Sequence, residues 1–331
     1  MTTPIIKLES VSKRFVKKLD IAEKFARRLG ASVQEHTVHA VDSVDMEIMP
    51  GEVVGLVGES GCGKSTLGRC VAGIHRPSDG VIRYQGEDVM KLRGKKLLES
   101  QLNVQMIFQD PMSSLNPRLK VTDIISEAPL FHGLIKRGEV DDYVAMTMQR
   151  VGLDPSYSQR YPHQFSGGQR QRIGIARALA VRPDFIVCDE AVAALDVSIQ
   201  AQVLNLFMDL REDLGLTYLF ISHDLGVVEH LSDRVVIMYL GRVVETARTE
   251  ELFDSPNHPY TQALLAEAPR LQTDRRVYAP IKGEIPSPLH PPKGCHFNPR
   301  CPHAMDRCRT EAPKLKEIAP GRASACHLND G

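Results

Sequence analysis

The stretch GESGCGKS, Gly58 to Ser65, decides the fold of this chain. It fits the pattern G-x-x-x-x-G-K-S/T and lies between EVVGLVG, a β-branched run that predicts a buried strand, and KSTLGRCVAGI, which predicts a helix. Gly58, Gly61 and Gly63 allow successive backbone N–H groups to turn toward an anion, and the start of the helix adds a favourable partial charge. The stretch therefore predicts a phosphate-binding loop between a strand and a helix.

Three side chains of this loop are expected to hold ATP together with Mg²⁺. Lys64 would reach the β and γ phosphates, the Ser65 hydroxyl would ligate Mg²⁺, and Thr66 belongs to the same nucleotide-binding set. The alternative is a tight strand-to-helix turn without a ligand. The predicted strand before the loop and the predicted helix after it favour the nucleotide.

Two adjacent acids, Asp189 and Glu190, follow FIVC (185–188), a second predicted buried strand. Asp189 would help to hold Mg²⁺, and Glu190 would orient or deprotonate the attacking water. Either acid alone fits a capping role, but the pair beside a phosphate loop indicates a metal and a water. A third predicted strand, TYLFIS (217–222), and the helical patterns between the strands predict an α/β fold with a largely parallel sheet covered on both faces.

The segment FSGGQRQRIGIARALA, residues 165–180, predicts a second helix start built to face an anion. Ser166 is a candidate N-cap, and Gly167, Gly168 and Gln169 precede an apolar pattern of helical period. These four residues are therefore assigned to nucleotide binding as well.

The motifs stand in an order that resembles the ATP-binding cassette (ABC) proteins. The order is the phosphate loop, Gln109 in MIFQDP, the signature SGGQ at 166–169, the acidic pair, and His223 in FISHD. The resemblance implies ATPase activity and the P-loop NTPase cassette fold, with a RecA-like core, an antiparallel β subdomain and a helical signature subdomain.

The same resemblance assigns roles to residues that are uninformative by themselves. It implies that Gln109 senses Mg²⁺ and the attacking water, that His223 contacts the γ-phosphate, and that Asp196 belongs to the nucleotide site. It also makes Phe15, in SKRF, the aromatic on which adenine stacks, although a lone aromatic residue fits the core equally well.

The chain carries one copy of each element, so the resemblance implies that the working unit is a pair. The signature of one cassette would close over ATP held on the phosphate loop of the other. ATP would join the pair and hydrolysis would release it, a switch that can drive a transporter.

Four longer segments narrow the resemblance to the ATPase subunits of bacterial oligopeptide and dipeptide importers, most closely the F-type subunit. The segments are GLVGESGCGKSTLGRC, IFQDPMSSLNPR, DVSIQAQVLNL and NHPYTQALLAEAP. The implied partners are a second, non-identical ATPase, two transmembrane permease subunits and a periplasmic or extracellular solute-binding protein. The resemblance also implies that the chain is bound peripherally at the cytoplasmic face of the inner membrane. Nickel, glutathione, opines and sugars remain open as substrates beside peptides.

Bulk properties bear on the rival functions. The 331 residues carry 41 Lys and Arg against 41 Asp and Glu, so no cationic field favours nucleic acid. No stretch approaches the roughly 18 apolar residues of a membrane span. A soluble ABC ATPase that acts on DNA or ribosomes is disfavoured, because about 100 residues without heptads separate Lys64 from Ser166 and only one P-loop is present.

Two alanines keep a third alternative open. Relatives read DEPVSALD where this chain has DEAVAALD, so Ala191 and Ala194 replace a proline and a serine. Neither position carries a proton or a metal in the expected mechanism. A weakly hydrolysing regulatory half of an asymmetric pair is the alternative that they motivate.

Composition divides the chain into a cassette at 1–256 and an irregular extension at 257–331. Prolines interrupt every periodic run there, at Pro256, Pro259, Pro269, Pro280, Pro286, Pro288, Pro291 and Pro292. A charged insert follows Phe15, and its residues Ile21, Phe25 and Leu29 share one face of a predicted helix, read as a surface elaboration rather than a membrane or partner contact.

The extension contains four cysteines, Cys295, Cys301, Cys308 and Cys326, at spacings x5, x6 and x17. An odd total of seven cysteines indicates reduced thiols or metal ligands rather than a disulfide framework. The spacing alone names no metal. Resemblance implies a [4Fe-4S] cluster. Zinc, with help from His296, His303 or His327, and free thiols are the alternatives.

Overall fold

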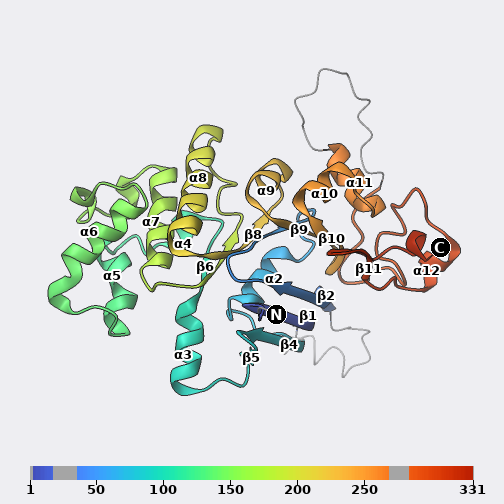
Figure 1. The fold of residues 1–331 in the computed structure, drawn as a ribbon, viewed down its shortest axis with the longest axis horizontal. Helices are drawn as coiled ribbons and strands as arrows, with labels where there is room; N and C mark the ends of the chain where they lie inside the picture. Colours follow the sequence, from blue (N-terminus) through green and yellow to red (C-terminus); the bar gives the residue numbers. More distant parts are fainter. Residues whose placement is uncertain (1–2, 18–35, 268–282, 331) are drawn as a thin grey trace, which may run out of the picture.

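The computed structural model describes residues 3–17, 36–267 and 283–330 (Figure 1). Two sheets organise these residues, a large mixed sheet and a small antiparallel one. The insert with its expected helix through Ile21, Phe25 and Leu29 lies outside the described residues.

The large sheet has eight strands in the order β11-β12-β10-β9-β3-β8-β7-β6. In that order the strands are Lys316–Ala319, Arg322–Ser324, Arg242–Arg248, Arg234–Tyr239, Val53–Val57, Thr217–Ser222, Phe185–Asp189 and Val104–Ile107. The five from β9 to β6 run parallel, and every residue of β3, β7 and β8 is buried. The three predicted buried strands are confirmed, and their uninterrupted apolar runs reflect a sheet covered on both faces.

Helices pack against the large sheet, and a group of helices lies beyond its edge at the left of the view (Figure 1). The helices are α2 (Lys64–Val71), α3 (Gly94–Asn103), α4 (Pro111–Ser114), α5 (Val121–Phe131), α6 (Val140–Arg150), α7 (Gly167–Leu179), α8 (Val197–Leu214), α9 (Leu225–Leu231), α10 (Thr249–Asp254), α11 (Pro259–Glu267) and α12 (Asp306–Thr310). Within the described ranges, the 3₁₀ turns η1 to η4 span Arg137–Glu139, Pro155–Tyr157, Pro162–Gln164 and His327–Asn329. Helices α5, α6 and α7 pack on one another as the expected helical subdomain. Among the described helices, none combines the length and apolarity of a membrane span.

The small sheet has the order β2-β1-β4-β5 and is antiparallel throughout. Its strands are β1 (Ile6–Lys17), β2 (His36–Ile48), β4 (Asp79–Tyr84) and β5 (Glu87–Asp88). Ile6 and Leu8 of β1 share a buried apolar cluster with Leu67 of α2 and Leu56 of β3. Helix α2 is therefore held between the two sheets, which fixes the start of the helix where the phosphate loop ends.

The C-terminal extension is largely irregular but contributes two short strands to the large sheet. β12 pairs antiparallel with β10, with Glu245 opposite Ser324. The Glu245 side chain is fully buried and accepts hydrogen bonds from the backbone N–H groups of Asn257 and His258, both at 2.8 Å. Arg322 of β12 donates to the same carboxylate at 3.3 Å. The extension is therefore built onto the core of the cassette.

Candidate active site

The phosphate loop joins β3 to α2 and is closely surrounded by backbone. Gly63 is the N-cap of α2 with a φ of 107°, and a Cβ there would lie 2.0 Å from the Ala40 carbonyl oxygen. A Cβ on Gly58 would lie 2.1 Å from the Met238 carbonyl oxygen. No side chain caps the helix start, so its N–H groups are left to an anion. Glycine is required at both positions for steric reasons.

Lys64 and Ser65 are the first two residues of α2. The Lys64 side chain is buried, and its Nζ donates to the carbonyl oxygens of Gly58 at 2.7 Å and Glu59 at 3.0 Å. The Ser65 hydroxyl donates to Asp189 Oδ1 at 2.7 Å. Burial raises the pKa of Asp189, and the hydrogen bond from Ser65 acts in the opposite direction. A hydroxyl beside a carboxylate is a set of oxygen donors that suits Mg²⁺.

Three residues from separate segments meet at one carboxylate oxygen. Gln109 Nε2 donates to Glu190 Oε2 at 2.7 Å, and His223 Nδ1 lies 3.4 Å from the same oxygen. Glu190 follows the carboxyl end of β7 with a φ of 47°, and its N–H donates to the Ile221 carbonyl oxygen at 3.0 Å. The structure therefore brings together the three residues predicted to be catalytic, beside the Asp189–Ser65 pair.

The signature is a capped helix start that faces solvent. Ser166 Oγ accepts from the N–H of Gln169 at 3.3 Å, and Gln169 Oε1 accepts from the N–H of Ser166 at 3.0 Å. Ser166 and Gly167 are exposed, and Gly168 is half-buried against Ile199. Both the predicted N-cap and the start of α7 are confirmed.

The segment after the acidic pair begins in the core and then reaches the surface. Ala191 is buried, whereas Ala194 and Asp196 are exposed. Asp196 is the N-cap residue of α8, but its side chain makes no cap hydrogen bond. The exposed alanine therefore lies on the loop that presents Asp196 to solvent.

Phe15 of β1 is 39% exposed, so the core alternative for this residue is wrong. Lys13 Nζ lies 5.0 Å from the centre of its ring, and the His75 ring meets it edge-on with centroids 5.6 Å apart. The adenine-stacking role stays a prediction. An exposed aromatic face is what that role requires.

The four cysteines of the extension line one small cavity, together with His258, Phe297, His303 and His327. Burial raises the pKa of Cys295 to about 11, and the neighbouring thiols reinforce this shift. Burial also raises the pKa of Cys301 and Cys326. In the described part of the chain, however, no group of three or more His, Cys, Asp or Glu side chains is spaced to hold a metal ion. The four thiols share one cavity, but their spacing in this structure is not that of a metal site.

The histidines proposed for zinc do not favour it. Both ring nitrogens of His327 are engaged, Nδ1 with Asp330 at 3.1 Å and Nε2 with the Glu311 carbonyl oxygen at 3.0 Å. His296 pairs through Nδ1 with the Leu240 carbonyl oxygen at 2.9 Å and is not part of the cavity wall. His303 lines the cavity.

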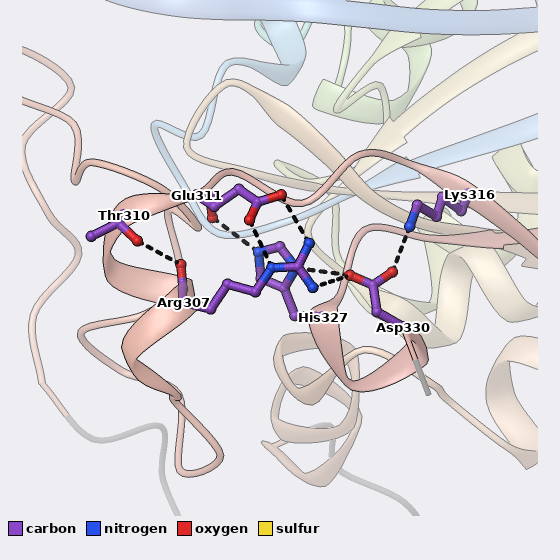
Figure 2. Close-up of polar contacts among 6 residues, drawn as sticks. All are labelled: Arg307, Thr310, Glu311, Lys316, His327 and Asp330. Atoms are coloured by element: carbon purple, nitrogen blue, oxygen red, sulfur yellow. Dashed lines mark hydrogen bonds and ion pairs between the residues drawn. The ribbon is translucent and has the colours of Figure 1, made fainter.

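A polar network joins the segments that carry the last two cysteines of the set, Cys308 and Cys326 (Figure 2). Arg307, next to Cys308 on α12, donates to Glu311 at 2.7 and 2.9 Å and to Asp330 at 2.9 Å. Asp330 also accepts from Lys316 of β11. Hydrogen bonds from Lys316 and then His327 lower the pKa of Asp330 to about 2. The network ties α12 to the turn after Cys326.

Sequence reasoning missed three residues that touch the phosphate loop or the cysteine cavity. Arg300 pairs with Glu59 of the loop, Tyr260 accepts from the Glu59 N–H, and the fully buried His258 lines the cavity. Burial lowers the pKa of His258 to about 4. Glu59 fills a variable position of the motif, and its partner lies 241 residues away, so no local signal marks the pair.

Fold and site together define a P-loop cassette for nucleotide hydrolysis, with the hydrolytic residues at the carboxyl ends of parallel strands. Residues 41–193 match the family described as ABC transporter. Residues 244–308 match the family described as oligopeptide/dipeptide transporter, C-terminal region, a match that begins inside β10.

Similar proteins and structures agree with this class. The chain is 49% identical to the oligopeptide transport ATP-binding protein AppF of Bacillus subtilis, over 98% of this chain and 97% of that protein. It is 50% identical to the putative oligopeptide transport ATP-binding protein YkfD of the same organism, over 89% and 91%. Among solved structures, cbiO1 of Clostridium perfringens aligns with a TM-score of 0.62 at 26% identity, over 76% of this chain and 92% of that one.

The chain belongs to the ATP-binding proteins of ABC transporters, in the branch that carries the oligopeptide/dipeptide transporter C-terminal region. It is an ATPase, with ATP and Mg²⁺ as the ligands that this family uses.

Proposed function

We propose that the chain hydrolyses ATP to energise the import of di- and oligopeptides across the bacterial inner membrane. The observation that carries the proposal is the meeting of Gln109 and His223 at the Glu190 carboxylate, beside a P-loop lysine and a Ser65–Asp189 pair. The names of the relatives, oligopeptide transport and peptide import ATP-binding proteins, support peptide as the substrate class.

In the proposed reaction the chain binds, orients and polarises. Backbone N–H groups from Gly58, Gly61 and Gly63 to Thr66 surround the phosphates, and the Lys64 ammonium moves from loop carbonyls to the β and γ phosphates. Phe15 stacks on adenine. Ser65, Asp189 and Gln109 would hold Mg²⁺, which would supply neutralisation of the phosphate charge.

The remaining residues act on the water and the leaving phosphate. Glu190 accepts a hydrogen bond from the attacking water and aligns it in line with the γ-phosphate. Gln109, already bonded to this carboxylate, holds its orientation. His223, which lies beside the same Glu190 oxygen as Gln109, contacts the γ-phosphate. Since each position is set by a strand end or helix start, little rearrangement is needed within the chain.

The proposed working unit pairs this chain with a second, non-identical ATPase subunit. Its support is the signature, because Ser166, Gly167, Gly168 and Gln169 form a solvent-facing helix start that is suited to an anion. Asp196 faces the same partner. Two permease subunits and a solute-binding protein complete the assembly, which places the chain peripherally at the cytoplasmic face of the membrane. No nucleic acid takes part.

The proposed division is a cassette at 1–256 and an extension at 257–331 that holds a [4Fe-4S] cluster. The support for the cluster is the shared cavity of Cys295, Cys301, Cys308 and Cys326, because four thiolates are the usual ligands of such clusters. Chemical assay of iron and sulfide, with the visible spectrum of anaerobically purified chain, tests this. Four iron per chain is the expected result, and zinc or no metal would contradict it.

Peptide uptake tests the proposed function. Cells that lack this chain should lose uptake of labelled di- and oligopeptides, and the wild-type chain should restore it. If nickel, glutathione, an opine or a sugar loses its uptake instead, the peptide assignment is wrong. If no uptake changes while the purified chain hydrolyses ATP, the chain is a soluble ABC ATPase that is not coupled to transport.

A further inference from the structure

Arg300 of the extension reaches into the cassette and pairs with the phosphate loop. It lies next to Cys301, and its side chain is only 5% exposed. Its two terminal nitrogens donate to the two carboxylate oxygens of Glu59 at 2.7 and 2.9 Å, and one of them lies 3.4 Å from the Tyr239 hydroxyl. Glu59 is the second residue of GESGCGKS. The C-terminal extension therefore binds the loop itself rather than a distant face of the cassette.

Every polar group of Glu59 has a partner, and two of these partners come from beyond residue 256. Its N–H donates to the Tyr260 hydroxyl at 2.9 Å, and its carboxylate receives Arg300. Its carbonyl oxygen accepts from Lys64 Nζ at 3.0 Å and from the Cys62 N–H at 3.2 Å. The extension thus fixes the side chain and the amide of a residue whose carbonyl holds the lysine of the P-loop.

The residues around the Arg300–Glu59 pair are closely packed. The rings of Tyr239, Tyr260 and Phe297 pack together, with centroids 4.6 to 5.4 Å apart. The Arg300 N–H donates to the Phe297 carbonyl oxygen at 3.0 Å. A two-point pair between an arginine and a carboxylate that is shielded from water is stronger and more directional than a surface pair. Removing one member leaves a buried charge without a partner.

We propose that Arg300 is a positioning residue for ATP binding: acting through Glu59, it holds the phosphate loop in the conformation that receives the triphosphate. The proposal rests on the proposed ATPase function and deepens it. Without Arg300 the Glu59 carboxylate is an unpaired negative charge within the loop that must accept phosphates. The loop would also lose the contact that orients the Glu59 carbonyl toward Lys64.

The test measures affinity of the full-length chain for MgATP by titration calorimetry, and KM and kcat for hydrolysis. Arg300→Gln is expected to weaken ATP binding roughly tenfold and to raise KM by a similar factor, with a smaller change in kcat, because the loop binds the phosphates before and during the reaction. Arg300→Lys, which keeps the charge but loses the fork, is expected to be intermediate.

Glu59 supplies the decisive comparison. Each single variant, Arg300→Gln or Glu59→Gln, leaves one charge without its partner, whereas the double variant leaves none. The double variant should therefore bind ATP more tightly than Arg300→Gln alone. If Arg300→Gln fails to fold, the same comparison is made between Arg300→Lys, Glu59→Gln and their combination.

Arg307→Gln is the matched control, because it breaks another two-point pair with a glutamate in the same extension that does not touch the loop. It is expected to leave ATP affinity unchanged. Wild-type affinity in Arg300→Gln, equal losses in the two arginine variants, or a double variant no better than the single one would each overturn the proposal. Failure of the wild-type chain to bind ATP would instead overturn the proposed function.

Discussion

The two glycine-rich turns that start α2 and α7 differ in how much of the chain surrounds them. At the first turn, Gly58 and Gly63 lie against carbonyl groups of other segments, and Lys64, the first residue of α2, is buried. At the second, Ser166 and Gly167 are exposed, and the side chains of Ser166 and Gln169 each accept a hydrogen bond from the other residue's backbone N–H. One turn is enclosed by its own molecule, and the other is presented to solvent.

This difference separates the steps that we propose for one chain from those that we propose for the pair. The enclosed turn, with Ser65, Asp189 and Glu190 beside it, holds the groups that the proposed function assigns to triphosphate binding and water activation. The exposed turn is a capped helix start that faces solvent, and the residues assigned to hydrolysis lie at the other turn. Substitutions in the first turn should therefore reduce ATP binding by the isolated chain. Substitutions in the second turn should reduce turnover only in the assembled pair.

The largest effect is expected from Glu190→Gln, which keeps the shape of the side chain but removes its negative charge. Turnover should fall by about 10² to 10⁴, the usual size of a general base contribution, while MgATP binding by the isolated chain persists. Glu212→Gln, on the exposed face of α8, is the control. Unchanged turnover of the pair would mean that this chain is the regulatory half that Ala191 and Ala194 allow.

Gly167→Asp tests the exposed turn. A Cβ at Gly167 meets only Leu195 Cδ2, at 3.9 Å, so the substitution fits within the chain. The added charge would face the phosphate of a partner's ATP, and turnover of the pair should fall about 100-fold. Affinity of the isolated chain for ATP should not change. A weaker affinity in the isolated chain would show that the two turns serve the same nucleotide.

Matched alanine substitutions compare the two turns directly. Gly63→Ala places a Cβ 2.0 Å from a carbonyl oxygen and requires a left-handed residue, so it should cost about 1–3 kcal/mol of unfolding free energy and lower ATP affinity about tenfold. Gly167→Ala should cost less than about 0.5 kcal/mol. Urea denaturation and ATP titration measure both. Similar costs at the two positions would contradict the contrast between enclosed and open turns.

The smallest effect is expected from Ala194→Ser. Ala194 is exposed, and a hydroxyl there has room and water around it. Turnover of the isolated chain should stay within about twofold, in keeping with a surface substitution. The rate of the assembled pair measures whether the hydroxyl improves coupling. A change in the isolated chain larger than this would place Ala194 inside the site rather than on the face toward the partner.

Motifs of the cassette could be predicted because each is set by residues close in sequence. The phosphate loop occupies eight consecutive positions, and the Ser166 cap bonds to a residue three positions later in the chain. The meeting of Gln109 with Glu190 spans 81 residues, and only resemblance to a known family placed them in one site. Exposure of Phe15 depends on tertiary packing and could not be decided from the sequence.

The extension illustrates the opposite case. Its prolines predict irregular structure, which describes most of it, but pairing of β12 with β10 depends on main-chain groups that any sequence carries. The contact between Arg300 and Glu59 spans 241 residues and joins a cysteine-rich turn to a variable position of a motif. Such contacts follow from the fold, so only the structure reveals them.

Attachment of β12 to the outside of β10 has a consequence for hybrids of related subunits. The join between cassette and tail at residue 257 suggests a convenient crossover point, but a crossover there would separate Glu245 from Arg322 and Glu59 from Arg300. A foreign tail would need to bring a compatible strand and two compatible arginines. Recombination that preserves function should therefore exchange whole chains, or tails together with the matching acids.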